Sequence, residues 1–202
     1  MRIQAAAPIV SLSLNAEAFP VFSSLPPGDL PANTSFCCTA VTYYFPHISV
    51  GGRFQTTLTY VNYSPGTVSC QTAFYSDSGA ALQIPFSDGV FSSRGDFLTL
   101  GGDIHVQTTA ALNGTLLSGW AEAQCTSAIN ASILYRLYNG NTAVGEASVT
   151  GVTAPTTEFV TFSQTETGVA FANPSETPAV VTITALDSLG LFLRQYLAHA
   201  AT

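Results

Sequence analysis

The sequence predicts an all-β protein made of antiparallel sheets, and three observations lead to this prediction. Apolar and polar residues alternate with a period of two in many short runs, which is the pattern of half-buried strands. Turn-forming residues separate these runs at intervals typical of sandwiches and barrels rather than of alternating strands and helices. One segment occurs twice in the chain, and both copies have the pattern of a strand, a turn and a second strand.

The body of the predicted fold begins near Thr39. The expected strands cover residues 39–45, 54–62, 67–75, 80–86, 97–100, 104–110, 116–125, 131–138, 142–150, 158–163, 167–173 and 179–186. Turn signals such as Ser64-Pro65-Gly66 and Asn139-Gly140 separate them. The tail, residues 191–200, is the one segment predicted as a possible helix, because its apolar residues could follow a helical period over a length too short to decide.

The N-terminal part reads as a strand followed by an extended linker. Ile9 and Val10 open an apolar run that then alternates through Leu12 and Leu14. Residues 20–32 are rich in proline, glycine and aspartate, and proline cannot donate to a strand ladder, so we expect an extended linker there. Residues 1–18 also have weak features of a secretory leader, but the polar and proline interruptions favour the strand interpretation.

Asn62 and Asn173 mark the repeated segment. Residues 57–64 are echoed by residues 168–175, and the two asparagines are 111 residues apart. Asparagine tolerates left-handed φ and can bond its own downstream backbone, so each copy is expected to shape a turn at the end of a strand. The repeat predicts two immunoglobulin-like sandwich halves related by internal duplication.

The repeated unit closes with a second turn. Asp77 and Gly79 end the first copy, and Asp187 and Gly190 end the second, so that each glycine follows its asparagine by 17 residues. An aspartate followed by glycine is a common way to close a hairpin. These positions are therefore interpreted as structural turn residues of the repeat and not as catalytic ones.

Charge is scarce in this chain. Charged residues make up 8% of 202 residues, there is no lysine, and the formal net charge is −7. Nucleic-acid binding requires clustered Lys and Arg to neutralise phosphates, so the composition argues against a nucleic-acid partner. The surface must be built mainly from uncharged polar residues, which repel copies of one another only weakly. No apolar run is long enough for a membrane-spanning helix.

Four cysteines are present, and they allow three pairings. Cys70 and Cys125 both lie in expected strands, and a disulfide between those strands is the preferred interpretation, with two buried thiols as the alternative. Cys37 and Cys38 are adjacent, and they could bond to each other, to two partners or between chains. Cysteine usage favours an oxidising, extracellular compartment.

No catalytic or metal-binding pattern emerges from the sequence. His47, His105 and His199 have no carboxylate or cysteine at ligand spacing, so no metal or other cofactor is expected. There is no G-x-S-x-G nucleophile elbow, and the aspartates lie mostly in expected turns. We therefore expect no enzymatic activity.

Two other sequence features suggest binding, and each has a structural alternative. The aromatic runs at residues 43–45 and at Tyr135 and Tyr138 could form a sugar-stacking platform, but core packing is the favoured use. Arg94-Gly95-Asp96 could act as an adhesion tripeptide on a loop tip, although a turn role is favoured.

Several motifs together resemble a repeat module of long secreted or surface-bound bacterial β-rich proteins. The motifs are Tyr44-Phe45-Pro46-His47, Gly51-Gly52-Arg53-Phe54-Gln55-Thr56-Thr57-Leu58, Phe74-Tyr75-Ser76-Asp77-Ser78-Gly79, Gly119-Trp120-Ala121, Gly145-Glu146-Ala147 and residues 167–175. The resemblance covers roughly residues 39–190. It implies an extracellular or surface location, immunoglobulin-like sandwich modules and no enzyme activity.

One departure from this resemblance suggests a mechanism of assembly. Residues 8–30 resemble the end of such a module although they come first, and the final strands expected after Leu193 are missing. A sandwich short of one strand exposes an open edge. Ile9, Val10, Leu12 and Leu14 of a neighbouring copy could fill that edge by β-augmentation, with a linker that reaches about 40 Å if extended. The alternative is that this strand pairs within its own chain.

Taken as a whole, the sequence predicts three segments: a strand with its linker at 1–38, a first sandwich half at 39–138 and an incomplete second half at 139–202. The predicted function is a non-catalytic extracellular structural subunit that polymerises into a filament by exchange of the N-terminal strand. The expected partner is therefore another copy of the same chain. The alternative is a monomeric adhesion or carbohydrate-binding module whose partners are surface glycans.

Overall fold

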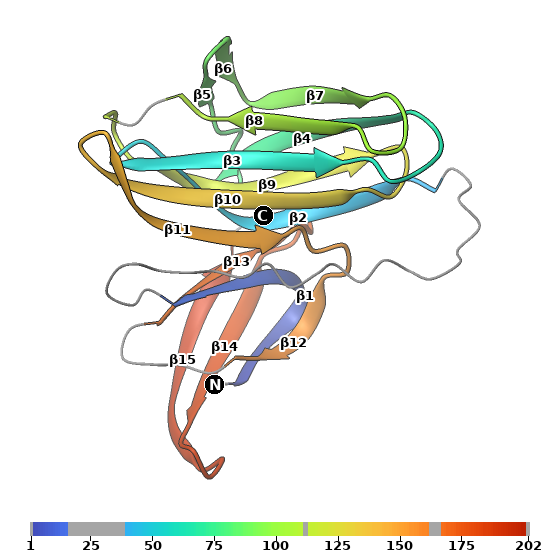
Figure 1. Cartoon of the computed structure of the whole chain (residues 1–202). Coiled ribbons are helices and arrows are strands. Elements are labelled where there is room, and N and C mark those ends of the chain that lie inside the picture. Colours follow the sequence, from blue (N-terminus) through green and yellow to red (C-terminus); the bar gives the residue numbers. More distant parts are fainter. Residues whose placement is uncertain (1, 16–38, 111–112, 162–166, 201–202) are drawn as a thin grey trace.

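The computed structural model describes residues 2–15, 39–110, 113–161 and 167–200, and this part of the chain is all-β (Figure 1). No helix occurs among these residues, and hence none that is long and apolar enough to span a membrane. The strands are β1 (Arg2–Asn15), β2 (Val41–Val50), β3 (Phe54–Val61), β4 (Val68–Ser76), β5 (Ile84–Phe86), β6 (Gly89–Phe91), β7 (Ser93–Leu98), β8 (Ile104–Thr108), β9 (Leu117–Cys125), β10 (Asn130–Asn139), β11 (Thr142–Thr150), β12 (Thr156–Val160), β13 (Thr167–Ala172), β14 (Ala179–Leu186) and β15 (Phe192–Ala200).

Strands β2 to β11 form a first unit, which is a two-layer sandwich. One sheet has the order β2-β9-β4-β7 and the other has the order β11-β10-β3-β8, and all pairs in both sheets are antiparallel. The short β5–β6 hairpin stands at one end of this sandwich (Figure 1). The predicted antiparallel all-β class is confirmed.

The core of the first unit follows from strand alternation. Phe45, Ala121 and Phe74 lie side by side on β2, β9 and β4, and each is at most 1% exposed. Leu58 and Ile133 face them from β3 and β10 and are equally buried. Because successive side chains point to opposite faces of a sheet, these residues fill the space between the two layers.

The disulfide predicted between Cys70 and Cys125 is confirmed. The two cysteines are directly paired on the neighbouring strands β4 and β9, with a Cα–Cα distance of 4.0 Å. Both lie in the core of the first unit. Cys37 and Cys38 lie outside the described residues.

Strands β12 to β15 form a second unit together with β1 from the start of the chain. One sheet has the order β12-β1-β14-β15, and the far part of β1 leaves it to pair with β13. A register shift between Gln4 and Ile9 accompanies the change from one sheet to the other. The second unit packs against β2 of the first through β1 and β13 (Figure 1).

The expectation of a helix in the tail is wrong. β15 pairs antiparallel with β14 along almost its whole length, from Ala200 opposite Ala179 to Phe192 opposite Leu186. The adjacent strand provides ladder hydrogen bonds for the backbone, whereas a helix of about ten residues has little stability of its own. The apolar residues of a short segment fit both periods, so only the neighbouring strand decides between them.

The boundary expected between residues 138 and 139 falls inside a paired hairpin. β11 is antiparallel to β10 from Asn139 opposite Thr142 to Ser132 opposite Thr150, so β11 belongs to the first unit. A further backbone bridge joins Val152 to Tyr44 of β2. The sheets therefore divide the chain after residue 152, because strand pairing rather than the turn at residue 140 defines the unit.

Candidate functional site

The second unit depends on β1 for its strand pairing. On one edge, Arg2–Ala5 of β1 pair with β14 and Val10–Asn15 pair with β13, while the other edge of β1 pairs with β12. Within the described part of the chain, β12 and β13 have no other strand partner. Without β1, only the β14–β15 hairpin would keep its ladder, and an isolated hairpin is marginally stable at best.

The predicted intersubunit strand lies within its own chain in this structure. Val10, Leu12 and Leu14 are opposite Ala172, Ala170 and Gly168 of β13, and Ile9 is opposite Thr156 of β12. This arrangement is the alternative that the sequence left open. The physical reason is simple, since β12, β13 and β14 of the same chain present the unpaired edges that β1 requires.

The β14–β15 hairpin has an open edge and an apolar surface. Among the described strands, β15 is the last of its sheet and pairs with β14 alone. Phe192, Leu193 and Leu197 on β15 are between 62% and 68% exposed, and Leu189 in the turn is 81% exposed. The hairpin extends away from the rest of the molecule (Figure 1). A long apolar edge strand of this kind is a site where another strand can add.

The two asparagine turns of the repeat have the same hydrogen bonds. Asn62 Nδ2 donates to the carbonyl of Gly66 at 2.7 Å, and Asn62 Oδ1 accepts from the backbone N–H and the hydroxyl of Ser64 at 2.9 and 2.8 Å. Asn173 repeats this pattern with Thr177 at 2.8 Å and Ser175 at 3.2 and 2.7 Å. Both asparagines are at most 2% exposed. In each unit the asparagine side chain therefore holds the turn that follows its strand through bonds to residues two and four positions further on.

The turns at Gly79 and Gly190, which close the two copies of the repeat, also have the same structure. Their aspartates, however, do not occupy equivalent positions. Gly79 N–H donates to the carbonyl of Ser76, and Gly190 N–H donates to the carbonyl of Asp187 in the same way. Both glycines have positive φ, 80° and 79°, which glycine adopts without strain. Asp187 therefore corresponds to Ser76, and Asp77 lies one residue beyond it on the exposed turn.

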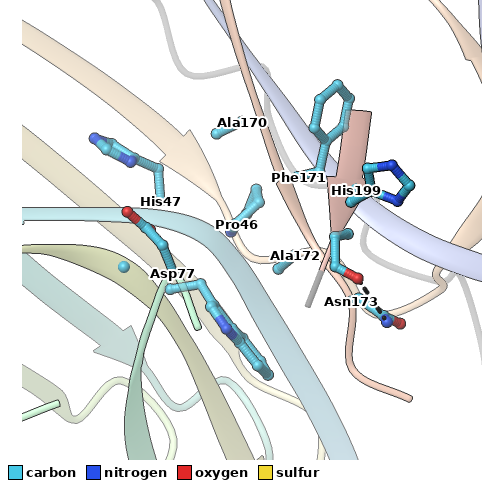
Figure 2. Close-up of a pocket in the computed structure, with 11 residues that line it drawn as sticks. Pro46, His47, Asp77, Ala170, Phe171, Ala172, Asn173 and His199 are labelled. Atoms are coloured by element: carbon cyan, nitrogen blue, oxygen red, sulfur yellow. Dashed lines mark hydrogen bonds between the residues drawn. The ribbon is translucent and has the colours of Figure 1, made fainter. Parts of the chain in front are cut away.

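A cleft lies where the second unit meets the first (Figure 2). One hollow of this cleft has a volume of about 210 Å³ and is lined by Pro46, His47, Asp77, Gly119, Trp120, Ala170, Phe171, Ala172, Asn173, His199 and Ala200. A second hollow beside it is lined by Tyr75, Gly79, Trp120, Glu122, Asn173, Pro174, Ser175 and Glu176. The structure thus brings the first glycine turn and the second asparagine turn of the repeat to one place.

Trp120 is the residue that both hollows share on the first unit. It lies on the outer face of β9, because its neighbour Ala121 faces the core. Its ring stacks on that of Tyr75, with centroids 4.4 Å apart and an interplanar angle of 21°. Sequence reasoning missed this site, although an outward-facing aromatic residue next to Glu122 on a predicted strand was the available signal.

The electrostatics of the cleft are acidic. Burial lowers the pKa of His47 below its ordinary value of 6.5, against a smaller opposing effect of Asp77, so this imidazole is neutral at pH 7. Its Nε2 lies 2.6 Å from the hydroxyl of Ser49. Burial, and secondly the charge of Glu122, raise the pKa of Tyr75, whose phenol therefore keeps its proton. Among the described residues, Asp77, Glu122 and Glu176 of the cleft form no ion pair with an arginine.

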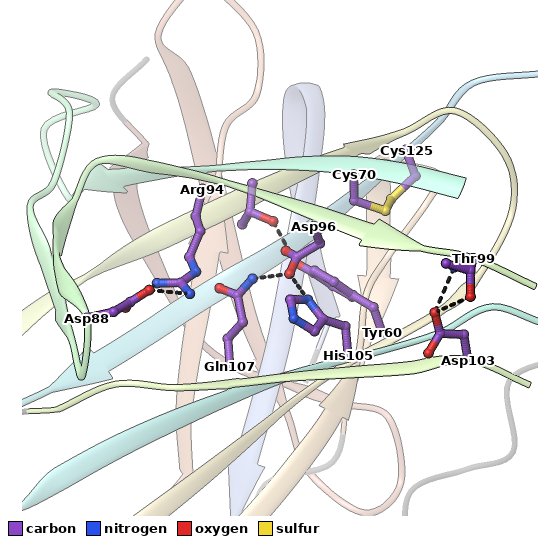
Figure 3. Close-up of polar contacts among 11 residues, drawn as sticks. Tyr60, Cys70, Asp88, Arg94, Asp96, Thr99, Asp103, His105, Gln107 and Cys125 are labelled. Atoms are coloured by element: carbon purple, nitrogen blue, oxygen red, sulfur yellow. Dashed lines mark hydrogen bonds and ion pairs between the residues drawn. A yellow bond between two sulfur atoms is a disulfide. The ribbon is translucent and has the colours of Figure 1, made fainter. Parts of the chain in front are cut away.

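A buried polar cluster occupies the opposite side of the first unit (Figure 3). Asp96 on β7 accepts hydrogen bonds from His105 and Gln107 of β8 and is 4% exposed. Arg94 pairs with Asp88 at 2.6 Å and lies over the ring of Phe86. The Arg94-Gly95-Asp96 tripeptide is thus part of a strand, and its aspartate faces inward rather than lying on a loop tip. The cluster links the edge strands of the two sheets.

The residues suggested for a sugar platform are mostly buried. Tyr43, Phe45 and Tyr135 are at most 5% exposed and belong to the core of the first unit. Among the described residues no group of three or more His, Cys, Asp and Glu side chains could hold a metal ion. The chain matches no family model, no curated protein and no solved structure.

Proposed function

We propose that this chain is a non-catalytic extracellular structural subunit that assembles with copies of itself by exchanging β1. The observation that carries the proposal is the position of this strand. β1 is the sole described strand partner of β12 and β13, yet it comes from the opposite end of the chain. A unit completed by a distant strand can be completed equally well by the same strand of a neighbour.

The backbone register favours exchange without loss of contacts. The pairing of Val10 with Ala172 and of Leu14 with Gly168 is the same whichever copy supplies β1. Residues 16–40 connect β1 to β2, and a chain of that length could span about 80 Å if extended. Donation from each copy to the next is a heterologous contact, and such a contact repeats into a filament when it does not close into a ring.

Three other features support this proposal. The low surface charge weakens repulsion between copies. The Cys70–Cys125 disulfide is typical of proteins from oxidising compartments, where it persists. The equal hydrogen bonds of the Asn62 and Asn173 turns support an origin of the two units from one duplicated immunoglobulin-like module.

A cysteine experiment tests strand exchange directly. Leu14→Cys and Gly168→Cys are suitable positions, because they are opposite in register and a side chain at residue 168 meets open space. Each substitution is made in a separate chain that also carries Cys37→Ser and Cys38→Ser. The two proteins are unfolded, refolded together and oxidised, and exchange is expected to give a covalent dimer on a non-reducing gel. In the control mixture, Ser87→Cys in the exposed β5–β6 turn takes the place of Gly168→Cys, and no covalent dimer is expected.

The same experiment can reject the proposal. A chain that carries both Leu14→Cys and Gly168→Cys should form the disulfide internally if the structure is a monomer. Internal bonds in the double variant together with an absence of dimers in the mixture would show that β1 stays in its own chain. Negative-stain images of the unmodified protein should then show single particles instead of filaments.

The second candidate function is a monomeric surface module. The observation that favours it is the pairing of β1 within its own chain. β1 already occupies the edges of β12, β13 and β14 that a strand from a neighbouring copy would need. Size-exclusion chromatography separates the two candidates, because the monomer has a mass of 21.1 kDa and a filament elutes in the void volume.

A further inference from the structure

We infer that the cleft between the two units binds a sugar ring, a pyranose without acidic groups, with Trp120 as its central contact. The inference gives the second candidate function a ligand class and a location, and it does not depend on strand exchange. It rests on the residues of the cleft, on the hydrogen-bonding capacity they leave unused, and on their charge.

Trp120 has a donor without an acceptor. The residue is 8% exposed, yet its indole N–H makes no hydrogen bond with any residue that the structure describes. The indole nitrogen does not belong to the fully buried atoms that lack a partner among the described residues, so its N–H is open to the cleft and can donate there. Trp120 lines both hollows of the cleft, so a ligand there can supply the missing acceptor.

The carboxylates of the cleft can accept further hydrogen bonds. Asp77 lines one hollow, and Glu122 and Glu176 line the neighbouring hollow. Glu122 accepts one hydrogen bond, from the amide of Gln124 at 2.6 Å. No ion pair of the described residues involves any of these three carboxylates. A ligand that fits must therefore donate hydrogen bonds as well as accept one.

These two requirements select the chemistry of the ligand. A sugar hydroxyl can both accept from the Trp120 N–H and donate to a carboxylate, whereas an ammonium group only donates. The apolar C–H face of a pyranose can also pack on an aromatic ring, and the partly exposed Tyr75, which stacks on Trp120, provides such a ring. Convergent polar groups beside an aromatic ring are a common feature of small-molecule sites.

Charge excludes acidic sugars from this cleft. Three carboxylates gather there, and the buried His47 is neutral because its pKa is lowered. The chain as a whole has a formal net charge of −7. A uronic acid or a sulfated sugar would be repelled at close range, whereas a neutral or amine-bearing sugar would not.

The test uses the fact that Trp120 is the only tryptophan of the chain. A glycan array with neutral, amine-bearing and acidic oligosaccharides selects a ligand for the full-length protein, and a titration then follows the fluorescence of Trp120. We expect saturable binding of a neutral or amine-bearing oligosaccharide, with a change in emission that choline or free lysine does not produce.

Substitutions then locate the site. Trp120→Phe keeps an aromatic ring but removes the N–H donor, and Glu122→Gln removes one charge without changing size. Each is expected to weaken binding about ten-fold in calorimetry, the effect of one lost hydrogen bond. The control Glu146→Gln alters a carboxylate on β11 that pairs with Arg136 outside the cleft, and it should bind as the unmodified protein does.

Three results would overturn the inference. One is a glycan array without any saturable neutral or amine-bearing ligand, and another is a preference for acidic glycans. The third is unchanged affinity in both Trp120→Phe and Glu122→Gln when thermal melts show that these variants are folded. None of these results bears on the gel assay for strand exchange, so the two proposals fail independently.

Discussion

The two units of this molecule use the same turn but bury very different cores. In the first unit, two four-stranded sheets face each other and enclose residues such as Phe74 and Leu58 at 1% exposure. In the second unit, Ala172, Ala179 and Val181 are the buried apolar residues among the described side chains, and Phe171 and Ile183 are only partly covered. In the second unit, β12, β1, β14 and β15 follow one another in a sheet, and β13 pairs with the far part of β1.

The hydrogen bonds of a turn can therefore form in a unit whether or not that unit buries a deep apolar core. The Asn62 and Asn173 turns form equally in both units because their bonds span only four residues. A deep core, in contrast, needs a facing sheet that covers the whole apolar side of its partner. Where that sheet is short, apolar side chains such as Phe192 and Leu197 stay exposed and become available for contacts between molecules.

The largest expected difference between the units is in core truncation. Phe74→Ala should lower the free energy of unfolding of the first unit by about 3–5 kcal/mol, because it leaves a cavity in a closed core. Phe171→Ala in the second unit should cost about 1–2 kcal/mol, since the side chain is only partly buried. Urea denaturation of both variants measures this, and equal losses would contradict the comparison.

The disulfide should stabilise the first unit alone. It closes a loop with a sequence separation of 55, and its removal in a Cys70→Ser, Cys125→Ser variant should cost about 2–4 kcal/mol. Hydrogen exchange should show faster opening of the first unit, whereas amides of the β14–β15 hairpin should change little. A comparable increase in both units would show that they unfold together.

The matched turns give an intermediate effect. Asn62→Ala and Asn173→Ala each remove an amide that makes hydrogen bonds in a buried turn, and each should destabilise its own unit by about 1–3 kcal/mol. Hydrogen exchange resolved by residue measures the two losses separately. If Asn173→Ala had no effect while Asn62→Ala did, the structural equivalence of the turns would not extend to energetics.

A dependence of stability on pH should arise at the boundary between the units. Burial lowers the pKa of His47 in the folded state, so the unfolded chain takes up a proton first as the pH falls. The contribution of this residue is therefore complete above its ordinary pKa of 6.5 and is lost as the pH falls toward the lowered value. The unmodified protein should lose more stability than His47→Gln between pH 7 and pH 5 in denaturation experiments, and parallel curves would contradict this.

The smallest effect is expected at the surface of the first unit. Arg136 and Glu146 form an ion pair of 2.7 Å between β10 and β11, and both side chains are more than a third exposed. Glu146→Gln should change the free energy of unfolding by less than about 0.5 kcal/mol, because exposed pairs contribute little. A loss several times larger would mean that this sheet edge is more sensitive than its exposure indicates.

Strand positions were largely predictable, and the candidate sites were not. The alternation in residues 142–150 and 179–186 gives the observed bounds of β11 and β14, because period two is a local property. The Cys70–Cys125 pairing was also predictable, since both cysteines lie in strands with the same inward phase. The tail was ambiguous because its apolar residues fit either period, and the presence of β14 beside it decided for a strand.

The sequence by itself determined the all-β class, most strand positions and the repeated asparagine turn, because each depends on side-chain alternation or on bonds within a few residues. Only the tertiary structure decided that β1 completes the second unit, that β11 belongs to the first, and that Trp120 meets Asn173 in a cleft. The pairing of β1 in the second unit and the meeting of Trp120 with Asn173 join residues more than 50 positions apart. All three features depend on which strand edges remain unpaired once the sheets assemble.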